Sequence, residues 1–388
     1  MNPGLDKITI KGLIVKSINY NLLKSCSNAS ISYGDRSSYS TVYMDRDKSV
    51  SAIKIEDNEK FLDLKLGVKT LPQGGRIPYC YLTLCVKFRD GNNIISLSAE
   101  EYRNYIDCVL QYIDDRYGID VRVGSTTKYD YMEIAYTIPM RITQVSFLNM
   151  GSLMMSFLSK RFKEEKSVYS HSKTHLDDII KKETGARYPK DFSRGNDSVS
   201  YVIYLKSGTD FWEKYHAEPE SHLIRFELRL KTAAKIKSVF GTNLLSEIDD
   251  GMIVSAFCDF HKSMQGKWEE WQISTQKEIQ SIIKQARIDH PYNWMHFVIS
   301  SFDGLADKKG LPIVIDINQI ISALPSNRNL SRNKSKIIKS LNDQIIKKQH
   351  QYWFSGDIKM IQSVFDSLEL INRNNHPRSS RTSTPKNP

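Results

Sequence analysis

The segment from His222 to Lys231 reads HLIRFELRLK, in which apolar and charged residues alternate. Successive side chains of a β-strand point to opposite faces, so this pattern predicts a strand with one buried face and one charged face. The charged face carries Arg225, Glu227, Arg229 and Lys231. One carboxylate between two guanidinium groups suits a site that holds a metal ion beside a phosphate. The alternative is a charge-paired ladder on the outer face of a half-buried strand.

Two other segments place reactive side chains on strands in the same way. Residues 200–206 read SYVIYLK, and alternation puts Tyr204 and Lys206 on one face. Residues 128–138 read KYDYMEIAYTI, in which Glu133 faces away from the apolar positions. If both strands lie beside HLIRFELRLK, a phenol, an ammonium, two carboxylates and two guanidinium groups converge. One or two carboxylates with water and phosphate oxygens are the ligands typical of Mg²⁺ or Mn²⁺.

The rest of the chain before residue 250 mixes strand and helix patterns. A helix is expected from about Glu100 to Tyr117, because Ser98 and Glu101 form a capping box and Gly118 ends the pattern. The fold class that we expect is α+β, an antiparallel sheet covered by helices on one side. The other expected elements are strands at 7–15, 60–68 and 79–88, helices at 151–166 and 175–183, a buried helix within 142–158, and a loop at 25–51.

Helical patterns dominate after the HLIRFELRLK strand, at about 232–248 and 253–288. Residues 315–324 and 331–348, with a turn between them, resemble a helix-turn-helix. Its candidate DNA-binding residues are Arg328, Arg332, Lys334, Lys336 and Lys339. An ordinary solvated basic helix is the alternative. We therefore predict a sheet-containing domain at 1–250, a helical accessory domain at 251–371, and a disordered basic tail at 372–388.

Composition narrows the class of partner. Lysine and arginine total 55 against 44 acidic residues, a net charge of +11, which favours polyanions such as nucleic acids. The sequence has no run of 18 apolar residues, so no membrane partner is expected. Five cysteines without a CxxC pair indicate a reduced, cytoplasmic compartment. No internal repeat is strong enough to identify, and no GxxxxGK[ST] loop for a nucleotide is present.

Three of these stretches together resemble a known family. They are Tyr204-Leu205-Lys206, the residues from Leu223 to Lys231, and Lys237-Ser238-Val239-Phe240-Gly241. In order and spacing they are similar to the filamentous-phage gene II type replication initiators and their plasmid and phage-island relatives. These enzymes nick one DNA strand to start rolling-circle replication. The resemblance covers about residues 65–250, with weaker likeness around Glu133.

The resemblance implies a role for each charged residue. Tyr204 would attack the scissile phosphodiester, leaving a 5′-phosphotyrosine and a free 3′-OH, and the same site would later rejoin the strand. Tyrosine has a pKa of about 10, so Lys206 would favour the phenolate. Glu227 and Glu133 would hold Mg²⁺ or Mn²⁺, and Arg225 and Arg229 would stabilise the transition state. Lys231 is a further candidate for contacting DNA.

The implied partners are double-stranded and single-stranded origin DNA, with a helicase and a DNA polymerase of the bacterial host, in its cytoplasm. Many rolling-circle nickases bind metal through a His-hydrophobic-His pair, and none of the nine histidines forms one, so the metal site is expected to be built from carboxylates. The alternative function is a non-catalytic origin-binding initiator or repressor, in which the charged strands are structural.

Overall fold

The structure is a computed structural model of the 388-residue chain. It describes residues 2–34, 43–46, 48–70, 72–73, 76–90, 96–140, 144–159, 161–165, 191–205, 222–290, 313–315 and 352–375.

One large sheet organises the part of the chain that the structure describes. Its eleven strands lie in the order β10-β11-β12-β13-β9-β1-β7-β6-β5-β3, with β4 paired to β5, and every pair is antiparallel. The strands are β1 (Gly4–Lys11), β3 (Ala29–Tyr33), β4 (Met44–Asp45), β5 (Lys48–Glu56), β6 (Asp63–Thr70), β7 (Arg76–Cys85), β9 (Lys128–Met140), β10 (Lys163–Glu164), β11 (Asp191–Gly195), β12 (Val199–Leu205) and β13 (His222–Leu230). Two smaller pairs lie outside this sheet, β2 (Ile14–Ile18) with β8 (Ile119–Arg122) and β14 (Ile313–Ile315) with β15 (Tyr352–Phe354).

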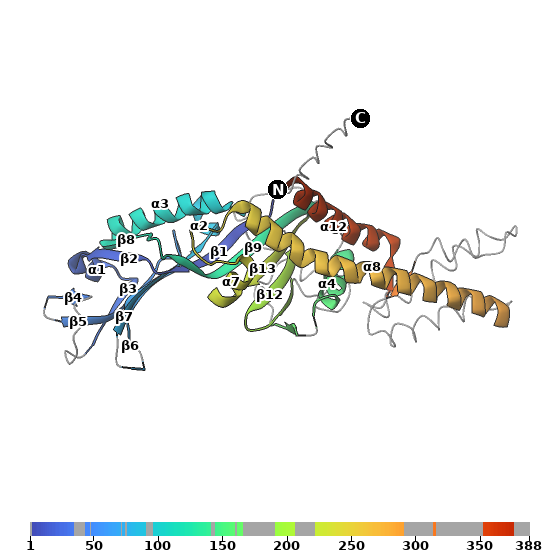
Figure 1. The fold of residues 1–388 in the computed structure, drawn as a ribbon, viewed down its shortest axis with the longest axis horizontal. Helices are drawn as coiled ribbons and strands as arrows, with labels where there is room; N and C mark the ends of the chain where they lie inside the picture. The colour runs from blue at the N-terminus through green and yellow to red at the C-terminus, as the bar shows by residue number, and fades with distance from the viewer. Residues whose placement is uncertain are drawn as a thin grey trace, which may run out of the picture.

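Helices pack against the sheet between and after these strands. Figure 1 shows α3 and α8 lying along one side of it, and both contact β1. The helices are α1 (Tyr20–Ser25), α2 (Lys87–Asp90), α3 (Ala99–Tyr117), α4 (Gln144–Ser156), α7 (Ala233–Phe240), α8 (Asp250–Asp289) and α12 (Ser355–Asn375). None of the helices in the described ranges is long and apolar enough to cross a membrane.

Apart from β2, β4, α2, β8 and α7, the described elements before residue 290 fall into two halves with the same order. The first half runs β1, α1, β3, β5, β6, β7 and α3, and the second runs β9, α4, β10, β11, β12, β13 and α8. In each half the first of these strands lies beside the fifth, followed by the fourth, third and second. The halves join where β1 pairs with β9. The described part of the large sheet therefore contains an internal repeat of strand topology, which the sequence alone does not reveal.

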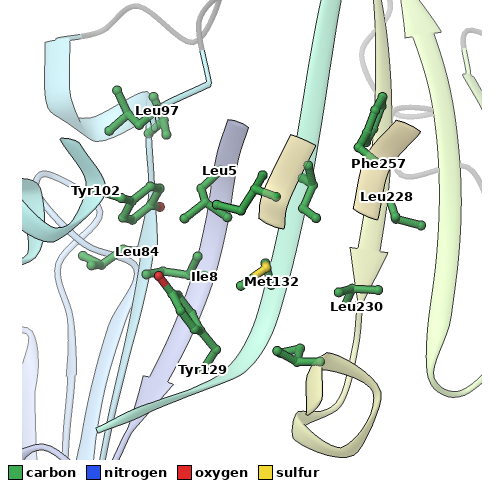
Figure 2. Close-up of a cluster of buried hydrophobic side chains, with 14 of the residues drawn as sticks. Leu5, Ile8, Leu84, Leu97, Tyr102, Tyr129, Met132, Leu228, Leu230 and Phe257 are labelled. Carbon is green, nitrogen blue, oxygen red and sulfur yellow. The ribbon is translucent and has the colours of Figure 1, made fainter. Parts of the chain in front are cut away.

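The apolar face of the sheet forms the hydrophobic core with the helices. Alternation turns Ile8, Met132, Leu228 and Leu230 to this face, where all four are at most 3% exposed. Figure 2 shows these side chains clustered across β1, β9 and β13, with Phe257 of α8 beside them. Burying this face orients every strand, so the opposite side chains of β9 and β13 must point away from the core.

One polar pair inside this core gives a pH-dependent prediction. His261 of α8 is fully buried, with Nδ1 2.8 Å from the Phe257 carbonyl and Nε2 2.6 Å from the Tyr201 hydroxyl. The carbonyl can only accept, so Nδ1 donates to it and Nε2 accepts from Tyr201. Burial lowers the pKa of His261 from 6.5 to about 4, against the opposing effect of the Phe257 hydrogen bond.

We expect His261 to cost stability as the pH falls from about 6.5 to about 4. In this window the unfolded histidine binds a proton and the folded one does not, so the free energy of unfolding decreases by on the order of 3 kcal/mol. Urea unfolding of the parent and of His261→Gln across this pH range isolates the contribution of His261 to the free energy of unfolding, because the two proteins share every other titratable group. The destabilisation caused by His261→Gln should shrink toward pH 4; a constant difference would contradict the assignment.

The coarse fold prediction is confirmed, since the chain combines a large antiparallel sheet with several helices, including a C-terminal one. The capped helix is also confirmed as α3, with Ser98 as N-cap, Glu101 completing the capping box and Gly118 as C-cap. The division into domains at residue 250 stays a prediction. Buried residues of α8 and α12 belong to the same core cluster as those of the sheet.

Several expected boundaries are wrong. The expected loop at 25–51 contains β3, β4 and the start of β5. Its serine-rich composition reflects a strand at the edge of the sheet, where most of β3 is exposed, rather than a loop. The expected strand at 7–15 breaks at Gly12, whose φ of 79° ends β1 before β2 begins. The expected helix at 151–166 is also displaced, because α4 spans 144–156 and residues 163–164 form β10.

The C-terminal predictions lie mostly outside the described residues. Helix α12 continues to Asn375, beyond residue 372, where the tail was expected to begin. Ile315, the expected start of the helix-turn-helix, lies in strand β14. The remainder of that motif, with its five basic residues, falls in 316–350 and is not described.

Candidate metal and phosphoryl-transfer site

The charged face of β13 is buried rather than solvated. The Arg225 and Glu227 side chains are 0% and 1% exposed, and that of Arg229 is 12% exposed. An isolated buried charge is very costly, so each of these groups requires partners of opposite charge. The pairing of charges that the ladder interpretation predicts is present between Arg225, Glu227 and Arg229, but on a buried face instead of an outer one.

Strand register brings Tyr204 to this face of the sheet. β12 pairs with β13 so that Tyr204 lies opposite Arg225, one residue pair from Glu227. Its hydroxyl donates a hydrogen bond to Oε1 of Glu227 over 2.7 Å, and the side chain is 3% exposed. The predicted meeting of the tyrosine and the carboxylate is therefore confirmed in the structure.

Glu133 reaches the same cluster from the other side of β13. It lies directly opposite Arg229 in the pairing of β9 with β13, and Oε1 is 3.4 Å from Nε of Arg229. The Tyr131 hydroxyl donates a hydrogen bond to the same carboxylate. The predicted convergence of Glu133 with Glu227 is thus present, with Arg229 bridging the two.

A third carboxylate, Asp6, was missed by the sequence analysis. Its Oδ1 lies 2.6 Å from Nη2 of Arg225. Strict alternation with Ile8 would turn Asp6 to the apolar face, but the pairing of β1 with β9 shifts register between Leu5 and Lys7. This irregularity leaves Asp6 as an extra residue and re-aims it toward the charged face. The signal in the sequence that could have pointed to Asp6 is an acidic residue within a strand that alternates with apolar positions. The irregular pairing that turns it toward the site cannot be read from the sequence.

Two arginines hold the three carboxylates together. Arg225 contacts Asp6 and Glu227, the latter by Nε at 3.1 Å from Oε1. Arg229 donates to Oε2 of Glu227 from Nη2 at 2.7 Å and from Nε at 3.2 Å. One oxygen of each carboxylate lies within 4.8 Å of the others. Glu227 is therefore at the centre of the cluster, since both of its oxygens are bound.

The surroundings shift the pKa values of Glu133 and Glu227 in opposite directions. Burial, reinforced by the charge of Glu227, raises the pKa of Glu133 to about 7 despite the opposing Arg229. Burial also acts to raise the pKa of Glu227, but the Arg229 and Arg225 guanidinium groups and the Tyr204 hydrogen bond outweigh it and hold that pKa below its usual value. Three carboxylates face two guanidinium groups, so a proton on Glu133 or an added cation balances the charge.

The donor set fits a hard divalent cation. Mg²⁺ and Mn²⁺ prefer oxygen ligands, and Asp6, Glu133 and Glu227 offer three carboxylates at close range. The three acidic side chains outnumber the arginines that neutralise them, which gives the site a net affinity for positive charge. The arrangement is capable of placing a cation next to a tyrosine hydroxyl and two guanidinium groups.

The remaining predicted site residues are not part of this cluster. Lys231 follows β13, and its ammonium contacts Glu165 and the Asn196 carbonyl oxygen at 2.5 and 3.0 Å. Its role in binding DNA stays a prediction. Lys206 lies outside the described residues, as do Arg328, Arg332, Lys334, Lys336 and Lys339.

Comparison with known proteins does not assign this chain to a family. No family model matches it, and no curated protein matches it.

Proposed function

We propose that this protein is a metal-dependent enzyme that cuts one strand of DNA through a tyrosine nucleophile and later rejoins it, as rolling-circle replication initiators do. The observation that supports it most is the hydrogen bond from the Tyr204 hydroxyl to Glu227, inside a cluster of three carboxylates and two arginines. The net charge of +11 is consistent with a polyanionic substrate.

In this proposal each group acts on the phosphodiester. The Tyr204 oxygen forms a bond to phosphorus while the bond to the 3′ oxygen breaks. Glu227 accepts the phenol proton, and the departing 3′ oxygen takes up a proton to become 3′-OH, so the transesterification is balanced. Arg225 and Arg229 stabilise the negative charge that grows on the phosphate oxygens. Mg²⁺ or Mn²⁺, held by Asp6, Glu133 and Glu227, would supply Lewis acidity.

The burial of Tyr204 adds a requirement to this proposal. Its side chain is 3% exposed and Glu227 is 1% exposed, so the site must open before a phosphodiester reaches the hydroxyl. The phosphate would then replace carboxylate oxygens as the partner of one or both arginines. A cation at the carboxylates would compensate the charge that the arginines give up.

A non-catalytic origin-binding protein is the second candidate, and one observation favours it. Asp6, Glu133 and Glu227 each have an arginine partner in the structure without any added ion. A buried network that satisfies its own charges can exist for fold specificity alone. In that case the protein binds DNA, and Tyr204 only completes the network.

The deciding experiment uses the parent protein with supercoiled plasmids that carry fragments of its replicon. With Mg²⁺ or Mn²⁺ we expect relaxation of one plasmid and covalent attachment of the protein to a 5′ end. Peptide mass spectrometry of the adduct should locate the nucleotide on Tyr204. Chelation by EDTA should abolish both products, because the carboxylates alone supply no Lewis acid.

Each other result of that experiment is informative. Specific binding without nicking in either metal would support the non-catalytic candidate. Nicking with a nucleotide on another tyrosine would exclude Tyr204 as the nucleophile. Full activity in EDTA would exclude a metal at the three carboxylates.

A further inference from the structure

The same face of the sheet that carries the site continues across the first half as a row of lysine and tyrosine. Register places Lys54 of β5 opposite Lys65 of β6, Lys65 opposite Tyr81 of β7, and Tyr81 opposite Lys11 of β1. The Lys54 and Lys65 side chains are 49% and 48% exposed. The apolar residues that alternate with them are buried on the other face, so this face of the first half is polar and accessible.

Two tyrosines form an aromatic platform on this face. The Tyr79 and Tyr81 rings lie with centroids 5.6 Å apart, and both side chains are partly exposed. Tyr79 lies opposite Gly67 of β6, and a Cβ atom built on that glycine would lie 2.9 Å from the Tyr79 hydroxyl. The absence of a side chain at Gly67 therefore lets Tyr79 reach across β6.

Lys7 links this face to the site. It lies opposite Glu133 on one side and Cys85 of β7 on the other, and its ammonium is 5.7 Å from the centre of the Tyr131 ring. Tyr131 in turn donates its hydroxyl to Glu133. The row of lysine and tyrosine reaches β1 at Lys11, and Lys7 lies further along the same strand on the same face, opposite Glu133. A chain bound on this face would therefore reach the three carboxylates by following β1 from Lys11 to Lys7.

The lysines on this face are held by weak partners. Lys54 is paired with Glu56, Lys65 with Asp63 at 3.3 Å, and Lys11 with Asp130. Exposed ion pairs of this kind contribute little to stability, so a phosphate can displace the carboxylates. Lysine rows beside exposed aromatic rings match a nucleic-acid strand, in which phosphates repeat along the chain and unpaired bases stack. In a duplex the bases are already stacked and paired, so a single strand is the better fit.

We propose that the polar face of β5, β6, β7 and β1 binds single-stranded nucleic acid next to the site, with Tyr79 and Tyr81 stacking on bases and Lys54 and Lys65 contacting phosphates. This inference rests on the proposed function, because the bound strand is taken to lead to the site where Tyr204 would cut it. The first half of the repeat is then a binding half, and the second half carries Tyr204.

Binding can be measured apart from cleavage. The probe is a fluorescein-labelled 20-nucleotide oligo-dT, titrated with full-length protein in EDTA and followed by fluorescence anisotropy. Lys54→Glu/Lys65→Glu should weaken binding by at least about tenfold and reduce the slope of log affinity against log salt by about 1.4. The matched control is Lys237→Glu/Lys284→Glu, two exposed lysines on α7 and α8. This control has the same net charge as Lys54→Glu/Lys65→Glu, and its affinity for the oligo-dT probe should differ from that of the parent by less than about threefold.

A second pair of variants tests the stacking. Tyr81→Phe keeps the ring and should bind like the parent, whereas Tyr81→Ala should lose about tenfold or more. Equal weakening by both lysine pairs would overturn the inference, because only net charge would then matter. No detectable binding by the parent would overturn it too. A parent that nicks DNA while Lys54→Glu/Lys65→Glu binds normally would leave the proposed function intact and remove this surface.

Discussion

Under the proposed function, a Tyr204→Phe protein is expected to form no covalent adduct with DNA and to lose nicking by at least about a thousandfold, because phenylalanine lacks the oxygen that would form the bond to phosphorus. The phenyl ring keeps the packing of β12, while the hydroxyl that donates to Glu227 is removed. The measurement is gel analysis of plasmid relaxation with Mn²⁺, together with detection of protein-linked 5′ ends.

The matched control is Tyr129→Phe. Tyr129 lies on the core side of β9, and its buried hydroxyl has no hydrogen-bond partner among the residues that the structure describes. Removing that oxygen should leave nicking unchanged. Anisotropy with origin DNA should show that Tyr204→Phe still binds, which separates lost chemistry from lost binding. An adduct at normal yield in Tyr204→Phe would exclude this tyrosine as the nucleophile.

An Arg225→Met protein is expected to lose about 3–5 kcal/mol of unfolding free energy, whatever the protein's function. Arg225 is fully buried and contacts both Asp6 and Glu227, so its removal leaves carboxylates without one of their positive partners. Urea denaturation followed by circular dichroism measures the loss. Should the variant fail to fold, Arg225→Lys, which keeps the charge but not the planar fork, gives a smaller value in the same direction.

Two comparisons sharpen the Arg225 result. Arg122→Met removes an arginine whose side chain is 67% exposed and paired with Asp120, and it should leave the free energy of unfolding nearly unchanged. Adding Asp6→Asn to Arg225→Met should recover part of the loss, since one uncompensated buried charge is removed. A cost below about 1 kcal/mol for Arg225→Met would contradict the buried network.

Alternation predicts the face of the strand on which most of the site residues lie. The pattern of HLIRFELRLK fixes which side of β13 each residue faces, and the same rule orients Tyr204 and Glu133. Alternation does not specify which strands are neighbours or in what register. The convergence of the three strands therefore remained a condition in the sequence argument, and the pairing of β13 with both β12 and β9 supplied it.

The features that the sequence does not reveal have two causes, which are local irregularities in strand pairing and differences in side chains between equivalent strands of the two halves. Asp6 reaches the site only because the β1–β9 pairing is irregular beside it. The sequence predicts a loop at the edge strand β3, because the strand is short and only Ala29 and Ile31 of its residues pack against the core. The internal repeat is hidden since equivalent strands carry different side chains, such as Lys65 on β6 and Tyr204 on β12. Shared topology constrains only the buried face, and the polar face is free to change.

The charged cluster draws on both halves of this repeat. Asp6 comes from β1 in the first half, whereas Glu133, Glu227 and Tyr204 belong to the second. Neither half on its own supplies all three acids. A fragment that contained only the second half would lack Asp6, and Arg225 would lose one of its buried carboxylate partners.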